Sequence, residues 1–332
     1  MPEEPSSSRR EFLSGQALRT QAAQAGEILA DALAEPPPPP TAPVAGDTVR
    51  LQTTAMACDF AVIMNPDRGE QIPGASDALQ RVHELESQMT VYREGGELAE
   101  INRRAFAGPV PVEAQLFELL TRAKRLAEQT GGAFDPTSGP LIALWRHCRA
   151  EGRVPSADEL DTVRRRLGIE QVAFDEAATS VRFLRDGVEL NLGGIGKGYA
   201  LDRIAAELES AGFTDFLIHG GHSSLLARGR HSGCDGWPVG IRNPLFPQQQ
   251  FATVLMRGGG LSTSGSGVQS FRHSGKRYGH ILDPRTGVPA TGMLSVSVIA
   301  PTAADADALS TAFFVMGLEK TRDYCDNRPE IG

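Results

Sequence analysis

A carboxylate and a hydroxyl lie one helical turn apart near the end of the sequence. Asp307 and Thr311 are four residues apart in the segment D-A-D-A-L-S-T, which starts at Asp305. Side chains at that spacing lie on the same face of a helix. Their oxygens could share a hard cation such as Mg²⁺. A structural interpretation competes with this one, because acids favour a helix N-terminus and a helical Thr often bonds back to a carbonyl. Taken alone, the segment favours the structural interpretation.

A glycine-rich segment is a second candidate for chemistry. Residues 191–199 read N-L-G-G-I-G-K-G-Y and lie between a predicted strand and a predicted helix. Amides at a helix N-terminus and the charge of Lys197 would attract a phosphate. The segment is not a Walker A loop, because Asn191 replaces the first glycine and Gly198 follows the lysine, and it does not fit GxGxxG either. A tight turn that needs glycine for steric reasons explains it equally well.

The densest polar segment is R-Y-G-H-I-L-D-P-R-T-G-V-P, at residues 277–289. On a strand over 280–282, His280 and Leu282 would share one face while Ile281 would point to the other. Asp283 begins a D-P-R-T-G turn and could serve only to cap it. A lone histidine beside a turn is more often structural than catalytic.

The elements that must position these groups are mixed. Helices are predicted over 77–88, 115–130, 156–167, 199–211 and 304–316, the third with Ser156 and Glu159 at capping-box spacing. Strands are predicted over 51–64, 172–174, 181–183, 188–192, 216–219, 224–228, 237–242, 251–256, 280–282 and 294–299. Strands followed by helices in both halves of the chain predict an α+β protein.

Composition excludes several classes of protein. The net charge of -8 and the pI near 5.5 argue against a nucleic-acid partner. The four cysteines form no CxxC pair, so neither a zinc site nor a disulfide framework is expected. No stretch is long and apolar enough to predict a transmembrane segment.

Residues 1–46 differ in composition from the rest. Apolar residues at helical spacing up to Leu33 predict an amphipathic helix, and the prolines at 36–40 predict an extended linker. The folded domain is expected over 47–332. Arg9 and Arg10 are typical of a twin-arginine export signal, but charged residues follow where the apolar stretch should be.

Taken together, these segments resemble the ApbE family of FAD:protein FMN transferases from about residue 54 to residue 317. The motifs that carry the resemblance are Met56-Ala57-Cys58, Tyr92 with 97–102, 132–137 with 139–141 and Trp145, 191–202, Ser264-Gly265 with 280–287, and 307–311. Six motifs in the family's order over most of the chain are specific, although none is decisive alone.

The resemblance implies a fold and a reaction. The fold would be an ApbE-like, T-fold-related α+β domain with mixed antiparallel sheets, packed helices and two closely joined halves. The family's closing strand would follow Gly332, so we expect the 47–332 domain to lack it. The reaction would be Mg²⁺-dependent transfer of FMN from FAD to a Thr or Ser hydroxyl of an acceptor protein, through a phosphoester bond and with release of AMP.

The resemblance also implies roles for individual residues. His280 would be the base that takes the proton of the acceptor hydroxyl, and Mg²⁺ would bind the Gly194 carbonyl, Asp307 and Thr311. The residues expected to contact FAD are Met56, Tyr92, Ala133, Phe134, Asp135, Asn191, Lys197 and Ile281.

Four positions depart from the family pattern. Asn191, His222, Ser266 and Ser310 stand where relatives carry an acid, so we expect weaker Mg²⁺ binding. An FAD pyrophosphatase giving FMN and AMP, or a non-catalytic flavin-binding protein, remain open alternatives. The resemblance implies an acceptor protein with a Thr or Ser flavinylation motif, in a membrane redox complex. It also implies that the protein is located in the bacterial periplasm, but the incomplete export signal leaves a cytoplasmic location open.

Overall fold

The computed structural model describes residues 47–332 apart from 67–68, 94, 247 and 267–269. The helix and the proline-rich linker predicted within 1–46, and the Arg9-Arg10 pair, lie outside the described residues. Among the helices of the described part, none combines the length and the apolar character needed to cross a membrane.

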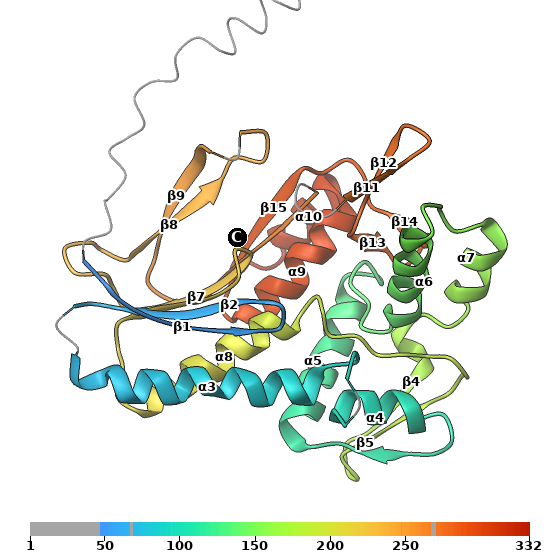
Figure 1. The fold of residues 1–332 in the computed structure, drawn as a ribbon, viewed down its shortest axis with the longest axis horizontal. Helices are drawn as coiled ribbons and strands as arrows, with labels where there is room; N and C mark the ends of the chain where they lie inside the picture. The colour runs from blue at the N-terminus through green and yellow to red at the C-terminus, as the bar shows by residue number, and fades with distance from the viewer. Residues whose placement is uncertain (1–46, 67–68, 94, 247, 267–269) are drawn as a thin grey trace, which may run out of the picture. The chain divides into compact units, whose positions relative to one another are not determined.

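An antiparallel six-stranded sheet forms the centre of the domain (Figure 1). Its strands, in spatial order, are β1 (Val49–Ala55), β2 (Cys58–Met64), β6 (Phe216–Gly220), β7 (Ser224–Arg228), β10 (Gly260–Gly265) and β15 (Ser295–Ala300). Three helices cover one face: α3 (Ile72–Met89), α8 (Gly196–Ser210) and α9 (Ala303–Met316). Beyond β15, Gly332 exchanges two backbone hydrogen bonds with Ile299, at 2.7 and 2.9 Å.

The opposite face of the sheet is partly covered by a hairpin. Its strands are β8 (Trp237–Arg242) and β9 (Gln250–Met256). Alternating side chains of the hairpin, Trp237, Val239 and Met256, are buried against Leu217 and Leu225 of the sheet. The period of two in the sequence therefore places an apolar face on the sheet.

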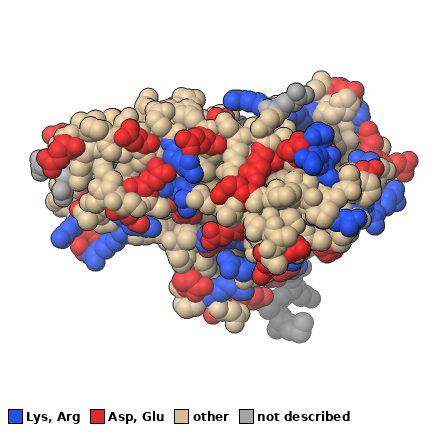
Figure 2. All heavy atoms as spheres, turned by 90° about the horizontal axis from the view of Figure 1, so that it is seen from below, with Lys and Arg blue, Asp and Glu red and all other residues tan. Residues whose placement is uncertain are grey.

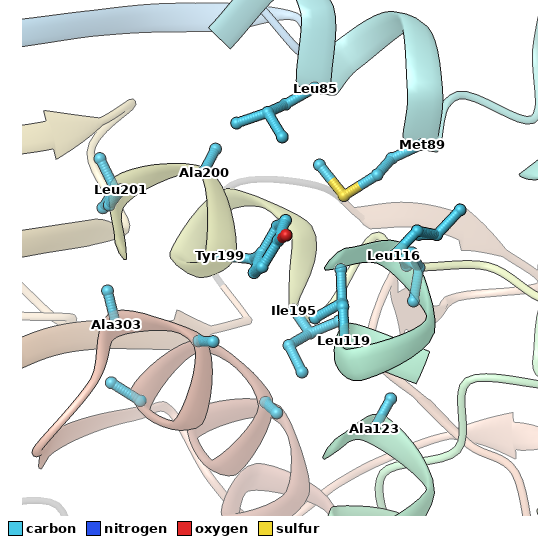
Figure 3. Close-up of a cluster of buried hydrophobic side chains, with 14 of the residues drawn as sticks. Leu85, Met89, Leu116, Leu119, Ala123, Ile195, Tyr199, Ala200, Leu201 and Ala303 are labelled. Atoms are coloured by element: carbon cyan, nitrogen blue, oxygen red, sulfur yellow. The ribbon is translucent and has the colours of Figure 1, made fainter. Parts of the chain in front are cut away.

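The main core lies between the helices and the sheet. Figure 3 shows Leu85 and Met89 of α3 meeting Leu116 of α5 (Ala114–Gln129) and Tyr199 of α8. Aromatic residues of the sheet, such as Phe60, are fully buried on the same side. Burial of a large side chain contributes about 1.5–3 kcal/mol, so this core fixes how the helices sit on the sheet.

The remaining elements complete the domain. They are η1 (Gly69–Gln71), α4 (Glu97–Arg104), α6 (Gly139–Ala150), α7 (Ala157–Arg164), η2 (Ile169–Gln171), α10 (Leu318–Asp326), the sheet of β3 (Val110–Pro111), β5 (Ser180–Phe183) and β4 (Val172–Asp175), and the hairpins β11 (Ser270–His273) with β12 (Lys276–Gly279) and β13 (Leu282–Asp283) with β14 (Val288–Pro289). Trp145 joins α6 to the turn of the β13–β14 hairpin by donating to the Gly287 carbonyl at 2.7 Å.

The α+β prediction is confirmed, and so is the capping box of Ser156 and Glu159 at the start of α7. Three predicted strands differ from the structure. The strand expected over 51–64 is the β1–β2 hairpin, and residues 188–192 form only a single bridge, from Glu189 to Ser138. The strand expected over 280–282 begins at Leu282, so His280 lies in a bend.

Candidate active site

The carboxylate of Asp307 is the most heavily bonded buried acid of the candidate site. It is 4% exposed, and the hydroxyls of Ser224 and Ser262 both donate to its Oδ1, at 3.2 Å each. The Gly198 amide donates to Oδ2 at 3.1 Å, and Lys197 Nζ lies 3.7 Å from Oδ1. These donors come from β7, β10 and α8, so a buried charge is held by three elements.

The helix that carries Asp307 is fixed at its N-terminus. Thr302 caps α9 by accepting from the Asp305 amide, and the Asp202 carboxylate of α8 accepts from Ala303 and Ala304 amides at 2.8 and 2.9 Å. Arg122 of α5 holds Asp305 through two hydrogen bonds, at 2.7 and 2.8 Å. The first turn of α9 is thereby tied to both neighbouring helices.

Thr311 lies one turn beyond Asp307, as predicted. Its hydroxyl bonds back to the Asp307 carbonyl at 3.4 Å, the contact expected from the structural interpretation. It also faces the glycine-rich segment, because a Cβ on Gly194 would lie 3.7 Å from Thr311 Oγ1 and 3.4 Å from the Phe134 ring. Asp307, Thr311 and Gly194 are therefore brought to one place.

The oxygens of this cluster suit a hard cation. A carboxylate, a hydroxyl and a carbonyl are the ligand types that Mg²⁺ prefers, and few protein ligands leave positions for water and phosphate. Within the described residues, no group of three or more His, Cys, Asp or Glu side chains could hold a metal ion. A magnesium held by Gly194, Asp307 and Thr311 fits the residues present.

Glycine in residues 193–198 has a packing role as well. None of Gly193, Gly194, Gly196 and Gly198 has a positive φ. A Cβ on Gly198 would lie 2.0 Å from the Ala303 carbonyl oxygen, so glycine there permits the close crossing of α8 and α9. Lys197 sits in the first turn of α8, where the helix dipole adds to its positive charge.

The turn between β1 and β2 approaches the same region. Met56 and Ala57 have φ of 50° and 59°, which forms a two-residue turn of the primed type. The Met56 amide donates to Glu86 of α3 at 2.9 Å. Burial raises the pKa of the thiol of Cys58, which follows this turn, and the charge of Lys197 acts in the opposite direction.

Tyr92 and Asn191 lie together at a cavity of about 420 Å³. Tyr92 is 64% exposed, and the guanidinium of Arg146 lies 4.6 Å from the centre of its ring. Asn191 Oδ1 accepts from the Gly193 amide at 2.9 Å, which shapes the start of the glycine-rich segment. A cavity with an exposed aromatic ring at its rim suits a planar ligand.

Ala133, Phe134 and Asp135 form a buried loop after α5. The Asp135 carboxylate points into the protein: Oδ1 accepts from the Thr137 amide and hydroxyl at 2.8 and 2.7 Å, and Oδ2 accepts from the Gly168 amide at 3.0 Å. Burial raises the pKa of Asp135 despite these donors. Its side chain braces the loop, which leaves the Phe134 ring facing Gly194.

His280 and Ile281 follow the β11–β12 hairpin. His280 is exposed, and Ile281 is buried and pairs through its carbonyl with the Ala290 amide at 2.9 Å. The Asp283 carboxylate accepts from the Arg285 guanidinium at 2.8 and 2.9 Å, which closes the turn that follows. Asp283 thus has the capping role foreseen from the sequence.

Sequence reasoning missed Ser224 and Ser262, the two hydroxyl donors to Asp307. Ser224 belongs to a predicted strand, and the motif before it drew attention to His222 rather than to the serine. Ser262 lies on β10, which reads as a loop because glycines 258–260 precede a run of Ser and Thr. The period of two in Ser262, Ser264 and Ser266 is the signal that could have revealed both the strand and its polar face.

Known proteins match this chain over nearly all the described residues. A family model described as the ApbE family matches residues 49–332. A Treponema pallidum protein named FAD:protein FMN transferase is 36% identical over 279 residues, which are 80% of this chain and 77% of that protein. A Klebsiella pneumoniae protein of the same name is 34% identical over 252 residues, covering 74% and 76% of the two chains.

Solved structures agree with the sequence comparison. The crystal structure of the ApbE protein from Thermotoga maritima superposes with a TM-score of 0.77 at 30% identity, covering 85% of this chain and 91% of that chain. The flavin transferase ApbE from Vibrio cholerae gives 0.75 at 27% identity, with 85% and 91% coverage. Family model, sequence relatives and fold all lead to one conclusion: the chain belongs to the ApbE family.

Proposed function

We propose that this chain is an FAD:protein FMN transferase, which moves FMN from FAD onto a Thr or Ser hydroxyl of an acceptor protein and releases AMP. The observation that carries the proposal is the cluster of Lys197, the buried Asp307 and Thr311 beside Gly194, in a chain of this family. The names of the relatives support the reaction, and the oxygen ligands of the cluster support magnesium.

Each residue of the site has a distinct task in this proposal. Gly194, Asp307 and Thr311 would hold Mg²⁺, which would supply positive charge to the pyrophosphate of FAD. Lys197 adds a positive charge beside Asp307, and the amides at the start of α8 face the same space. Exposed His280 takes the proton from the acceptor hydroxyl.

The flavin site is formed by the other predicted residues. Tyr92 and Asn191 lie at the cavity, Phe134 faces Gly194, and Met56 lies in the β1–β2 turn, where its amide donates to Glu86 of α3. Ala133, Asp135 and Ile281 are buried and support the loops that carry their neighbours. The acceptor would be a protein with a Thr or Ser flavinylation motif, in a membrane redox complex.

An FAD pyrophosphatase would use the same residues, with water in place of the acceptor hydroxyl. The two activities are separated by incubating the protein with FAD, Mg²⁺ and a peptide that bears a D-G-x-(S/T)-G-A-(S/T)-like acceptor motif, and measuring flavinylated peptide and free FMN by mass spectrometry. We expect flavinylated peptide with the wild type and none with H280A. Free FMN without flavinylated peptide would contradict the transferase proposal, and absence of both products would support a non-catalytic flavin binder.

The metal assignment is tested without activity. We expect Mg²⁺ to raise the thermal midpoint of the wild type in the absence of FAD, and D307N to abolish that response because it removes the carboxylate ligand. D305N is the matched control: it removes an acid from the same helix turn and breaks the contact with Arg122, but it should retain the Mg²⁺ response. Equal responses from both variants would place the metal elsewhere.

A further inference from the structure

The chain contains a long stretch without acids next to His280. Residues 236–282 include no Asp or Glu but five Lys or Arg, although the whole chain has 41 acids and a net charge of -8. On the face drawn in Figure 2, basic and acidic side chains lie interspersed. The acid-free stretch is therefore an exception in this protein, and it ends at the proposed base.

Three of these cations belong to the β11–β12 hairpin, which projects at the upper right of Figure 1. Arg272, Lys276 and Arg277 are all exposed. In the described part of the chain, none of the three forms an ion pair. Arg277 donates to the Ser270 hydroxyl at 2.9 Å and to the Ser266 carbonyl, and Lys276 lies 5.3 Å from the Tyr278 ring centre.

The two faces of the hairpin differ in character. Phe271 and Tyr278 are directly opposite each other and pack on Trp145 of α6, with ring centres 6.2 and 5.7 Å from the indole. Since side chains alternate along a strand, Arg272 and Arg277, which are also directly opposite each other, point away from α6. The aromatic face anchors the hairpin and the arginine face is presented outward.

A pair of like charges directly opposite on a hairpin is destabilising. The hairpin meets the α6–α7 region where His273 hydrogen-bonds with the Gly152 carbonyl, and the acids of that region, Glu151 and Glu159, are both paired with Arg153. The outward face therefore carries an unfavourable charge pair that an acidic partner would relieve.

The position of the face identifies that partner. Arg277 precedes His280 by three residues, which span at most about 10 Å of extended chain. A protein segment whose hydroxyl reaches His280 would place its neighbouring residues within reach of the arginines. We propose that the outward face of the hairpin, formed by Ser270, Arg272, Arg277 and Gly279, docks an acidic segment flanking the acceptor hydroxyl; this inference rests on the proposed function.

The test uses R272E, because this substitution places a carboxylate opposite Arg277 and should stabilise the hairpin while it cancels the positive face. Two synthetic peptides serve as acceptors: both contain the flavinylation motif with one acceptor threonine, and the motif is flanked in one by three aspartates and in the other by three asparagines. We expect the wild type to flavinylate the acidic peptide with a KM roughly tenfold lower, and R272E to lose that preference. The KM for FAD and the rate of FAD turnover without acceptor should not change.

R242E is the matched control, since Arg242 is an exposed arginine on the β8–β9 hairpin. It should keep the preference for the acidic peptide. High salt should reduce the preference of the wild type and leave R272E unaffected, because the interaction is between exposed charges.

The outcomes separate the docking inference from the proposed function. If the wild type flavinylates both peptides with equal KM, or if R272E keeps the preference, the docking inference is overturned while transfer stands. If R272E instead raises the KM for FAD, the face serves the FAD phosphates and the inference is also overturned. If the wild type flavinylates neither peptide and releases FMN, the proposed transfer fails and the docking inference falls with it.

Discussion

At the scale of single residues, the β1–β2 turn that approaches the site has an unfavourable backbone conformation. Met56 and Ala57 both adopt left-handed backbone conformations, at φ of 50° and 59°, although neither is glycine. Such a conformation costs an ordinary residue about 1–2 kcal/mol. The β1–β2 pairing on both sides of the turn and the hydrogen bond from Met56 to Glu86 hold it in place.

A57G should therefore stabilise the protein. Glycine relieves the left-handed strain, and this gain exceeds the loss of about 0.4–1 kcal/mol that comes from a more flexible unfolded chain. We expect a net gain of about 0.5 kcal/mol or more in the free energy of unfolding, measured by urea titration. A61G makes the same change within β2 and should destabilise, because Ala61 is buried in extended backbone. A lower midpoint for A57G would contradict the strain argument.

At the scale of elements, the site depends on the crossing of α8 and α9. Gly198 allows the α8 backbone to meet the start of α9, and the same crossing brings the Gly198 amide to Asp307. The close packing of α8 on α9 and the hydrogen bond from the Gly198 amide to Asp307 are therefore both consequences of one helix contact. A change in that contact should affect both stability and the response to cations.

G198A tests this contact. A Cβ there would lie 2.0 Å from a backbone oxygen, which cannot rotate away as a side chain would. We expect a loss of about 3 kcal/mol in the free energy of unfolding, together with a weaker rise of the thermal midpoint on addition of Mg²⁺. G74A is the control within a helix: its Cβ would meet only the Phe213 ring at 3.4 Å, and it should be neutral or stabilising. Equal behaviour of the two variants would refute the packing role.

The link between α8 and α9 also predicts a pH dependence. Burial raises the pKa of Asp202 from 3.8 to about 6, and this outweighs its hydrogen bonds from Ala304 and Ala303. The folded state therefore binds a proton more tightly than the unfolded state, so this group's contribution to stability is greatest below pH 4 and declines as pH rises through 6. The difference between the two pKa values corresponds to at most about 3 kcal/mol.

D202N should lack this decline. Urea unfolding of the wild type and of D202N between pH 4 and pH 7 measures the difference in their free energies of unfolding. We expect this difference to shift in favour of D202N as pH rises. A difference that is independent of pH, or that shifts in favour of the wild type, would show that the hydrogen bonds to the α9 amides dominate over burial.

At the scale of the whole molecule, burial rather than covalent cross-linking holds the fold. The core joins the helices to the sheet, and the four cysteines are all free. Burial is the largest influence on the pKa of Cys58, Cys148 and Cys325, and it raises each of them, which keeps these thiols protonated.

Stability should therefore not depend on reducing agents. We expect the thermal midpoint to be the same with and without dithiothreitol, and a thiol reagent to count four free thiols in the unfolded protein. Fewer than four thiols, with a midpoint that falls on reduction, would show that disulfides contribute to the fold.

The sequence by itself determined the fold class, the family and most of the helices, because these follow from local periodicity, caps and ordered motifs. The spacing of Asp307 and Thr311 is such a local property, and the structure retains it on one helix face. The strand over 51–64 was mispredicted because its left-handed turn is formed by Met56 and Ala57. Such turns are usually marked in a sequence by glycine or asparagine, and neither is present here.

Only the tertiary structure decided which residues share the site. Ser224 and Ser262 reach Asp307 from strands 83 and 45 residues away in the chain, and no local pattern encodes such a distance. Gly198 shows the same limit, since a glycine required by a helix crossing and one required by a phosphate look alike in a sequence. Long-range packing brings these groups together, because burial of α9 on the sheet fixes its position relative to β7 and β10.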